Sequence, residues 1–370
     1  MGFLDFAFYG FVAVVIIQVV FYVFLFGKFA FSKQKKVTPK NIAISVIICA
    51  KNEAENLKRF LPSIIEQDYP NFEIVLINDS SKDDTLEVIH HFSKLHDNLK
   101  VVNVKSIEAF WGNKKYALTL GIKASKNDFL LFTDADCKPV SKYWIKEMSA
   151  HFSNTKSIVL GYGAYSKIKN SILNKLVRFE TLITAINYFS FAKSSLPYMG
   201  VGRNLAYTKK EFFDANGFIN HIKLRSGDDD LFVNQIATQN NTTICFSKDS
   251  FTESIPKTTF KGWFKQKRRH VSTAKHYKMK HKVLLTLLYI SNVLFWLFAI
   301  ILFVSLFKWQ MVLGLFIFRI VLQYTILGVS SKKLGETDLL VSLPFLEIFL
   351  IITQLTIFIN NLISKPIHWK

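Results

Sequence analysis

Two aspartates, Asp134 and Asp136, follow the apolar segment 129–132 with a single residue between them. Alternate residues of an extended chain share a face, so both carboxylates could reach one metal ion if the extended geometry continues. If the chain turns at this point, one aspartate would bind the ion and the other would orient a ligand or a water. Carboxylate oxygens suit Mg²⁺ or Mn²⁺, which commonly keep waters and bridge to substrate phosphates. The alternative is an ordinary acidic turn.

A second acidic group is the run Gly227, Asp228, Asp229 and Asp230. Adjacent carboxylates repel one another, which raises the pKa of at least one of them. A carboxylate with a raised pKa is suited to remove the proton from a hydroxyl group as a general base. The alternative is a solvated helix N-terminus before the apolar segment 231–236.

The segment 257–282 contains ten Lys or Arg residues and no Asp or Glu. Inside it, Gln266 and Arg269 could face a diphosphate, because a guanidinium group binds two phosphate oxygens and stabilises charge on a leaving group. The alternative is a surface for anionic lipid headgroups, which the apolar run directly after the segment favours. Nucleic acid fits this setting less well, and we expect no nucleic-acid partner.

Strand-like and helix-like segments alternate from residue 41 onward, and this order predicts an α/β fold. Such alternation is typical of a mostly parallel sheet covered by helices on both faces. Ligands of such sheets bind beyond the carboxyl ends of the strands. The predicted strands are 42–49, 72–77, 101–104 and 129–132, and the predicted helices are 53–67, 86–95 and 114–124.

The residues just after the first two strands are therefore candidates for ligand contact. Asn52 and Glu53 follow the first strand, and Asp79 follows the second. The Asp79 carboxylate could accept hydrogen bonds from a nucleobase N–H or a ribose hydroxyl. Its alternative role is an Asx turn or an N-cap for a helix that begins at Lys82.

Four apolar runs cover residues 3–26, 283–306, 311–327 and 339–363. Half of the chain is hydrophobic and its mean hydropathy is +0.22. A membrane-spanning helix takes about 20 mainly apolar residues. We predict membrane spans, with buried core helices as the alternative.

The charges beside these runs predict their orientation. A cleaved signal peptide is not expected, because Asp5 precedes the first run and Lys28 and Lys33 follow it. Basic residues stay on the cytoplasmic side, so the N-terminus lies outside and residues 28–282 lie inside. If all three later runs cross, residues 332–333 also lie inside, whereas Lys365 and Lys370 would lie outside, against the rule.

The chain carries a net charge of +20 and three cysteines without metal-ligand spacing, which fit a reducing compartment. We predict a multi-pass protein of the cytoplasmic (inner) membrane with a cytosolic catalytic domain. The predicted parts are an N-terminal anchor (1–27), the cytosolic domain (28–256), a basic interfacial segment (257–282) and a membrane region of about three helices (283–370).

Taken together, residues from about 43 to 270 resemble the family 2 glycosyltransferases, which are inverting enzymes with the GT-A fold. The segment 45–53 resembles the opening strand of that family and its Asn-Glu turn, formed here by Asn52 and Glu53. The segment 77–83 resembles the second-strand motif, normally two aspartates followed by Gly-Ser. The first of those aspartates is Asn78 here, which leaves Asp79 for the nucleoside contact.

Further motifs follow in the order of the family. The segment 112–118 resembles the stretch that lines the donor site, which points to Lys114, and Asp134 and Asp136 match the metal motif. Residues 202–206 resemble the loop before the acceptor site. Residues 227–229 resemble the motif whose last aspartate is the base, which indicates Asp229 and leaves Asp228 open.

Gln266 and Arg269 are similar to the Gln-x-x-Arg-Trp motif of the processive members, but His270 replaces the tryptophan. The resemblance therefore implies transfer of one or a few sugars, with a processive polysaccharide synthase as an alternative. A membrane nucleotidyl or phosphoryl transferase could use the same sheet and metal ion. A catalytically silent scaffold would need one of the carboxylates to be dispensable.

The resemblance implies a nucleotide-diphosphate sugar as donor. Its base would lie near Asp79, and its diphosphate would lie on Mg²⁺ or Mn²⁺ held by Asp134 and Asp136, with Arg269 and Lys114 stabilising the leaving group. The implied acceptor is a lipid, a lipid-linked sugar or a cell-surface glycan. The segment 167–198 could be an interfacial helix that guides a lipid, or an ordinary domain helix. The implied donor-binding residues are Asn52, Glu53, Asp79, Lys114, Asp134, Gln266 and Arg269.

Overall fold

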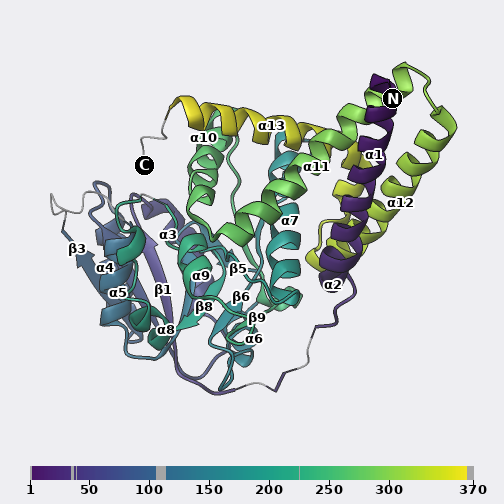
Figure 1. Ribbon diagram of the computed structural model, residues 1–370. Coiled ribbons are helices and arrows are strands. Elements are labelled where there is room, and N and C mark those ends of the chain that lie inside the picture. Colours follow the sequence, from purple (N-terminus) through teal and green to yellow (C-terminus); the bar gives the residue numbers. More distant parts are fainter. Residues whose placement is uncertain (1, 35–36, 39, 106–113, 225, 365–370) are drawn as a thin grey trace.

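A computed structural model describes residues 2–34, 37–38, 40–105, 114–224 and 226–364. An α/β domain occupies one part of the molecule, and long apolar helices from both ends of the chain gather beside it (Figure 1).

The main sheet has seven strands in the order β3-β2-β1-β4-β8-β6-β9. The strand β8 runs antiparallel to both of its neighbours, and the other pairs are parallel. This confirms the predicted mostly parallel sheet. The strands are β1 (Ile44–Ala50), β2 (Phe72–Asp79), β3 (Leu99–Val104), β4 (Phe129–Asp134), β6 (Ile158–Leu160), β8 (Leu205–Thr208) and β9 (Thr242–Ile244).

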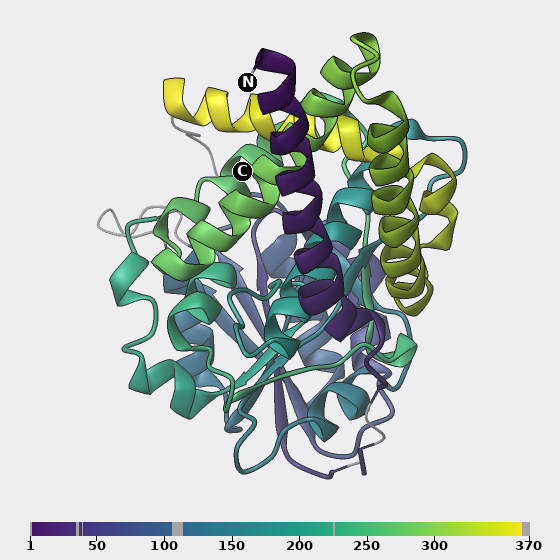
Figure 2. The same cartoon turned by 45° about the vertical axis from the view of Figure 1, so that its right-hand side comes forward.

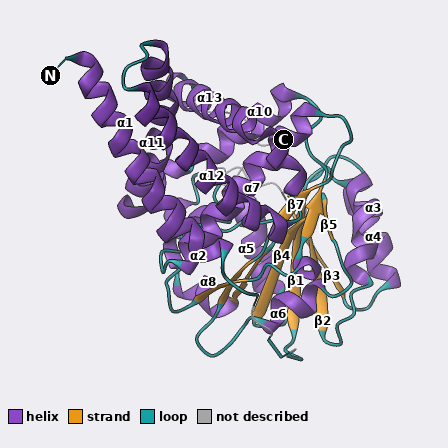
Figure 3. Ribbon diagram, turned by 90° about the vertical axis from the view of Figure 1, so that its right-hand side faces the viewer, coloured by secondary structure: helices purple, strands orange, loops and turns teal. Residues whose placement is uncertain are grey.

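Helices cover both faces of this sheet, because alternate strand residues enter two different cores. On β1, Val46 and Ile48 pack with α3 and α4, whereas Ile47 faces the core that contains α5 and α7. Figure 3 shows α3 and α4 on one side of the strands and α7 on the other. The domain helices are α3 (Ala54–Ile65), α4 (Thr85–Leu95), α5 (Lys114–Ala124), α6 (Trp144–Ala150), α7 (Ile172–Lys193), α8 (Lys209–Asp214), α9 (Asp230–Ile236) and α10 (Phe260–Val271).

A small second sheet begins with β5, the strand that directly follows β4 in the sequence. It has three strands in the order β5-β10-β7, where β10 pairs antiparallel with β5 and parallel with β7. Their bounds are β5 (Cys137–Pro139), β7 (Gly163–Tyr165) and β10 (Thr252–Ser254). Because β5 begins directly after Asp136, this sheet fixes the chain on the far side of the predicted metal motif.

Among the described residues, four helical stretches are long and apolar enough to cross a membrane: Phe3–Ala30, Met279–Val304, Trp309–Leu334 and Thr337–Ile363. The first consists of α1 (Phe3–Val20), a π-helical turn (Phe21–Phe26) and α2 (Gly27–Ala30); the others contain α11 (Met279–Val304), α12 (Trp309–Leu334) and α13 (Leu343–Ile363). The helices α1, α11 and α12 share one apolar core. In contrast, α13 runs across these three helices (Figures 1 and 2).

Candidate active site

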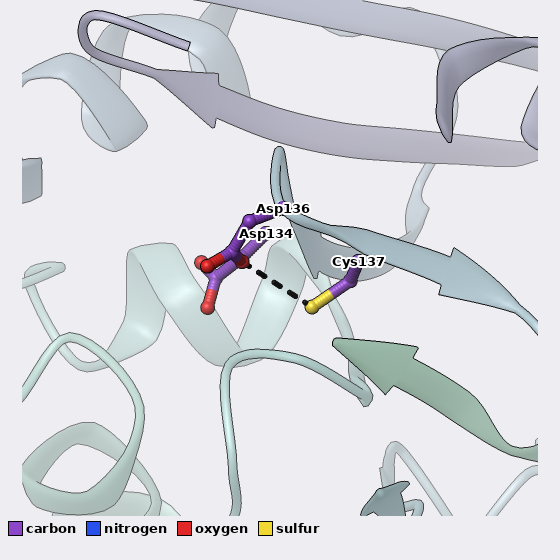
Figure 4. A group of neighbouring side chains, drawn as sticks. All are labelled: Asp134, Asp136 and Cys137. Carbon is purple, nitrogen blue, oxygen red and sulfur yellow. Dashed lines mark hydrogen bonds between the residues drawn. The ribbon is translucent and has the colours of Figure 1, made fainter. Parts of the chain in front are cut away.

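The aspartates of the predicted metal motif lie together. Asp134 is the last residue of β4, and Asp136 follows one residue later. One ligand atom each of Asp134, Asp136 and Cys137 lies within 4.8 Å of the others. Figure 4 shows both carboxylates turned to the same side. The spacing therefore brings two oxygen ligands to one point, as Mg²⁺ or Mn²⁺ requires.

Cys137 differs from the two aspartates in its chemistry. Burial, together with Asp136 and Asp134, raises the pKa of its thiol well above the ordinary value. The neutral thiol donates a hydrogen bond to Oδ1 of Asp136, with 3.5 Å between the heavy atoms. Carboxylate oxygens suit a hard cation better than a thiol does, so Asp134 and Asp136 are the candidate ligands in this group.

Lys114, the first residue of α5, connects the two acidic groups. Its Nζ atom lies 2.9 Å from Oδ1 of Asp134 and 2.9 Å from Oδ2 of Asp228. Burial acts to lower the pKa of this ammonium group, but the two carboxylates outweigh it and raise the pKa well above the ordinary value. Lys114 is therefore a fixed positive charge between the predicted metal motif and the acidic run. Residues 112 and 113 of the same motif lie outside the described residues.

The acidic run forms the turn before α9 and the first residue of that helix, and each of its carboxylates has different partners. Asp229 accepts hydrogen bonds from the backbone N–H groups of Gly202 and Asp230, both at 2.7 Å. Burial and the neighbouring charges of Asp228 and Asp230 raise the pKa of Asp229 to about 7. The pKa of Asp228 is lowered, because Lys114 outweighs the effect of burial. Asp229 thus has the pKa that suits a general base.

Asp230, the third carboxylate of this run, is held inside the protein by hydrogen bonds. Its Oδ2 atom accepts hydrogen bonds from the hydroxyl groups of Thr273 and Tyr277, and only 8% of the residue is exposed. Burial raises the pKa of Asp230 despite these two hydrogen bonds. The run is therefore a helix N-terminus, as its alternative reading proposed, but the chain that follows α10 encloses Asp230, so this end of the helix is not solvated.

Arg269 and Gln266 lie on α10 and line the same cavity as the acidic groups. Burial lowers the pKa of Arg269, whereas the charges of Asp228, Asp134 and Asp229 act in the opposite direction. These interactions place the guanidinium group in the field of both acidic groups. The Nε2 atom of Gln266 donates to the hydroxyl of Tyr165 at 3.5 Å.

At the other end of the cavity, Asp79 is the last residue of β2 and is 4% exposed. It pairs with Lys51, whose Nζ atom lies 3.4 Å from Oδ2 of Asp79. The following helix, α4, begins at Thr85 with Asp84 as its N-cap, which is one residue before the predicted start at 86 and three residues after the alternative start at Lys82. Asp79 therefore does not cap that helix.

Asn52 connects the loops after β1 and β2. Its side-chain oxygen accepts from the backbone N–H of Lys82 at 2.8 Å, and its own N–H donates to Oγ of Ser81 at 3.0 Å. Asn52 is exposed and is not among the residues that line the cavity, whereas its neighbours Lys51 and Glu53 are. Its hydrogen bonds hold the loop that presents those neighbours.

One cavity of about 660 Å³ contains nearly all of the predicted site residues, a volume in the range of ligand pockets. Its far end reaches α7, α11 and α13 through Glu180, Leu285 and Gln354. Sequence reasoning missed Leu285 and Gln354, because apolar runs carry no local signal for a cavity, and it covered Glu180 only as part of the segment 167–198. The predicted residues that line it are Glu53, Asp79, Lys114, Asp134, Asp136, Asp228, Asp229, Gln266 and Arg269.

Comparison with known proteins agrees with this geometry. Residues 45–213 match the family model "Glycosyl transferase family 2". Glycosyltransferase AglE of Haloferax volcanii is 32% identical over 120 residues, which are 32% of this chain and 38% of the relative. A poly-beta-1,6-N-acetyl-D-glucosamine synthase of Staphylococcus epidermidis is 32% identical over 179 residues, which are 42% of this chain and 41% of the relative. The chain thus spans about two fifths of these relatives.

A solved structure shows the same fold. The mannosyltransferase PcManGT from Pyrobaculum calidifontis, in complex with GDP-Man and Mn²⁺, superposes with a TM-score of 0.59 at 16% sequence identity, over 90% of this chain and 98% of its own. The α/β domain is therefore of the GT-A type. With the family match, residues 45–213 form a domain of glycosyltransferase family 2, and the chain carries long apolar helices at both ends.

Proposed function

We propose that this protein transfers a sugar from a nucleotide-diphosphate sugar to a lipid, a lipid-linked sugar or a cell-surface glycan, with inversion at the anomeric carbon. One observation carries the proposal: a single cavity joins Asp134 and Asp136, Asp229 and Arg269, and membrane-type helices line its far end. We further propose that the domain of residues 28–256 lies in the cytosol, as its flanking charges predict.

The two aspartates fit Mg²⁺ or Mn²⁺, because they offer neighbouring carboxylate oxygens, which hard cations prefer. When bound there, such an ion would neutralise charge on the donor diphosphate. The likeness to a mannosyltransferase solved with GDP-Man and Mn²⁺ supports this assignment.

Residues of the chain would bind the nucleoside, stabilise the leaving diphosphate and take up the acceptor proton. Asp79 and Lys51 lie where the nucleoside would bind, and Glu53 lines the cavity beside them. Lys114 and Arg269 would stabilise the diphosphate as it leaves. Asp229 would take the proton of the acceptor hydroxyl while its oxygen bonds to the anomeric carbon and the bond to the diphosphate breaks. A nucleoside diphosphate is released, and one displacement inverts the configuration.

The far end of the cavity supports an acceptor that is held at a membrane. Leu285 of α11 and Gln354 of α13 both line it, although both belong to helices that are long and apolar enough to span a bilayer. An acceptor anchored in lipid would reach Asp229 from this side. Glu180 and Thr184 of α7 also line this end of the cavity. Both lie in the segment 167–198, which the sequence suggests as a guide for a lipid acceptor.

Processive polysaccharide synthesis is the second candidate. The likeness to a poly-N-acetylglucosamine synthase and the Gln266 and Arg269 pair on α10 favour it. His270, which lines the same cavity, occupies the place of the tryptophan of the processive motif, so the motif is incomplete. Transfer of one or a few sugars therefore remains our first proposal.

The test is mass spectrometry of lipids after membranes that contain the protein are incubated with a panel of nucleotide sugars and Mn²⁺. We expect one donor to give lipids heavier by one or a few sugar units, with release of a nucleoside diphosphate. Membranes with the Asp229→Asn variant serve as the control. Release of pyrophosphate would instead indicate a nucleotidyl transferase, and long polymers would indicate the processive alternative.

A further inference from the structure

The helix α13 is attached to the catalytic domain although it is long and apolar enough to cross a membrane. It runs across α1, α11 and α12 and lies beside α10 and α7 (Figures 1 and 2). One of its faces is buried, with Leu346 and Ile357 at most 6% exposed, whereas Phe345 on the other face is 79% exposed. The buried face is fixed at three points along its length.

The first point lies just before the helix begins. Arg178 of α7 donates to Oε2 of Glu336 and to Oδ2 of Asp338, each at 2.9 Å. The side chains of Arg178 and Glu336 are only 3% exposed. Lys167 adds hydrogen bonds to the carbonyl of Gly335 and to Asp338. The connection between α12 and α13 is therefore fastened to the catalytic domain.

The second point is in the second turn of α13. Glu347 accepts from Arg319 of α12 at 2.6 Å, from Gln323 at 2.8 Å and from the indole N–H of Trp296 at 3.3 Å. Arg319 is fully buried and also donates to Gln18 of α1 at 2.6 Å. Ionisable groups among apolar helices are costly unless they are paired. Because this pair is satisfied, it docks α13 on the three membrane-type helices.

The third point is the end of α13, where Arg268 of α10 binds the last turn. Its guanidinium group donates to Oδ1 of Asn361 and to the carbonyl of Asn360, both at 3.0 Å, and to the carbonyl of Ser364 at 2.7 Å. The Nδ2 atom of Asn361 donates back to the carbonyl of Arg268 at 3.0 Å. The last carbonyl groups of a helix lack partners within the helix and attract cations, so Arg268 matches this end in geometry and in charge.

Arg268 directly precedes Arg269, and neighbouring residues of a helix point about 100° apart. Arg268 therefore reaches α13 while Arg269 lines the cavity. At the start of α10, the rings of Phe260 and Phe349 also meet, with centroids 6.1 Å apart. Contacts at both ends of α10 thus fix its position and its rotation relative to α13.

We propose that Arg268 is a positioning residue, which holds Arg269 at the donor diphosphate by fastening α10 to the end of α13. In this arrangement α13 is a brace between the membrane helices and the active site. The inference rests on the proposed function only in the role of Arg269 toward the diphosphate.

The test compares nucleoside diphosphate binding and sugar transfer in Arg268→Ala, Arg269→Ala and the double variant. The probe is UDP or GDP, whichever binds the unmodified protein in the presence of Mn²⁺. A guanidinium group displaced by about 1 Å can cost about a hundredfold in rate. We therefore expect Arg268→Ala to lose roughly 10- to 100-fold in transfer, and the double variant to lose no more than Arg269→Ala alone.

Two further variants separate positioning from general stability. Arg268→Lys keeps the charge but loses the forked geometry, so it should restore only part of the loss. Asn361→Ala removes the hydrogen-bond partner of Arg268 on α13, so it should also reduce transfer. If Arg268→Ala does not fold, Asn361→Ala takes its place in the test. Arg59→Ala, at an exposed site on α3, is the matched control and should leave transfer unchanged.

Losses of Arg268→Ala and Arg269→Ala that multiply in the double variant would overturn the inference, because independent effects multiply. Normal binding and transfer by Arg268→Ala would overturn it as well. If Arg269→Ala itself binds the nucleoside diphosphate normally, the proposed role of Arg269 is wrong. The inference about Arg268 then fails because its premise fails, which the earlier two outcomes do not show.

Discussion

The backbone N–H of Gly202 donates a hydrogen bond to Oδ2 of Asp229, with 2.7 Å between the two heavy atoms. A Cβ atom at position 202 would lie 3.3 Å from the same oxygen, so glycine allows this close approach. The loop before β8 therefore fixes the orientation of the carboxylate that we propose as the general base. The other carboxylate oxygen accepts from the N–H of Asp230.

The first prediction concerns the identity of the base. Asp229→Asn should lower the rate of sugar transfer by about 10²- to 10⁴-fold, the usual contribution of general base catalysis, while nucleoside diphosphate binding stays near normal. The measurements are initial rates and calorimetric titration. Asp214→Asn, at an exposed site on α8, is the control. A larger catalytic loss in Asp228→Asn than in Asp229→Asn would transfer the assignment to Asp228.

The second prediction is the pH dependence of transfer. Burial and the charges of Asp228 and Asp230 raise the pKa of Asp229 to about 7. A base must be ionised to accept a proton, so the rate at saturating substrate should rise up to pH 7 and level off above it. Initial rates from about pH 5.5 to about pH 9 would show this limb. A rate that stays constant below pH 6 would contradict the assignment.

The third prediction links Lys114 to the same profile. Lys114 acts to lower the pKa of Asp229, so Lys114→Met should move the acidic limb of the rate profile to higher pH. It should also slow transfer, because Asp134 and Asp228 lose the ammonium group of Lys114 that lies between them. The control is Lys123→Met, which changes an exposed lysine in the last turn of the same helix. An unshifted limb would show that Lys114 and the base are electrostatically independent.

The fourth prediction concerns the metal. Asp136→Ala should weaken Mn²⁺-dependent binding of the nucleoside diphosphate by at least about tenfold, because even outer-shell partners of metal ligands contribute about 10- to 100-fold. Calorimetric titration with Mn²⁺ and with a chelator measures this. With the chelator in place of Mn²⁺, the variant and the unmodified protein should bind the nucleoside diphosphate equally weakly. Asp97→Ala, at an exposed position, is the control, and equal binding by Asp136→Ala in Mn²⁺ would remove this residue from the metal site.

The fifth prediction concerns stability. Arg178→Ala leaves the buried Glu336 without its main partner, and the loss of one member of such a pair costs about 3–5 kcal/mol. The apparent melting temperature in detergent should therefore fall clearly. Lys210→Ala breaks an exposed pair with Asp214, which is worth about 0–1 kcal/mol, and should change little. Equal melting temperatures for the two variants would show that the buried pair does not hold the domain to α13.

The sequence by itself determined the order of the elements and the positions of the acidic groups. The predicted strand 129–132 and helix 114–124 correspond to β4 and α5, because hydrophobic periodicity is a local property that survives folding. Since parallel strands end at one edge of a sheet, the order of the strands was enough to place Asp79 and Asp134 near one another. The four apolar runs were evident from length and composition alone.

Only the tertiary structure decided how these parts meet. The pairing of Lys114 with Asp228 joins residues that are far apart in the chain, and this pairing separates the pKa of Asp228 from that of Asp229. The structural position of Asn52 and the crosswise path of α13 also depend on partners in other elements. Local patterns contain no information about such partners, because packing brings distant segments together only when the whole chain folds.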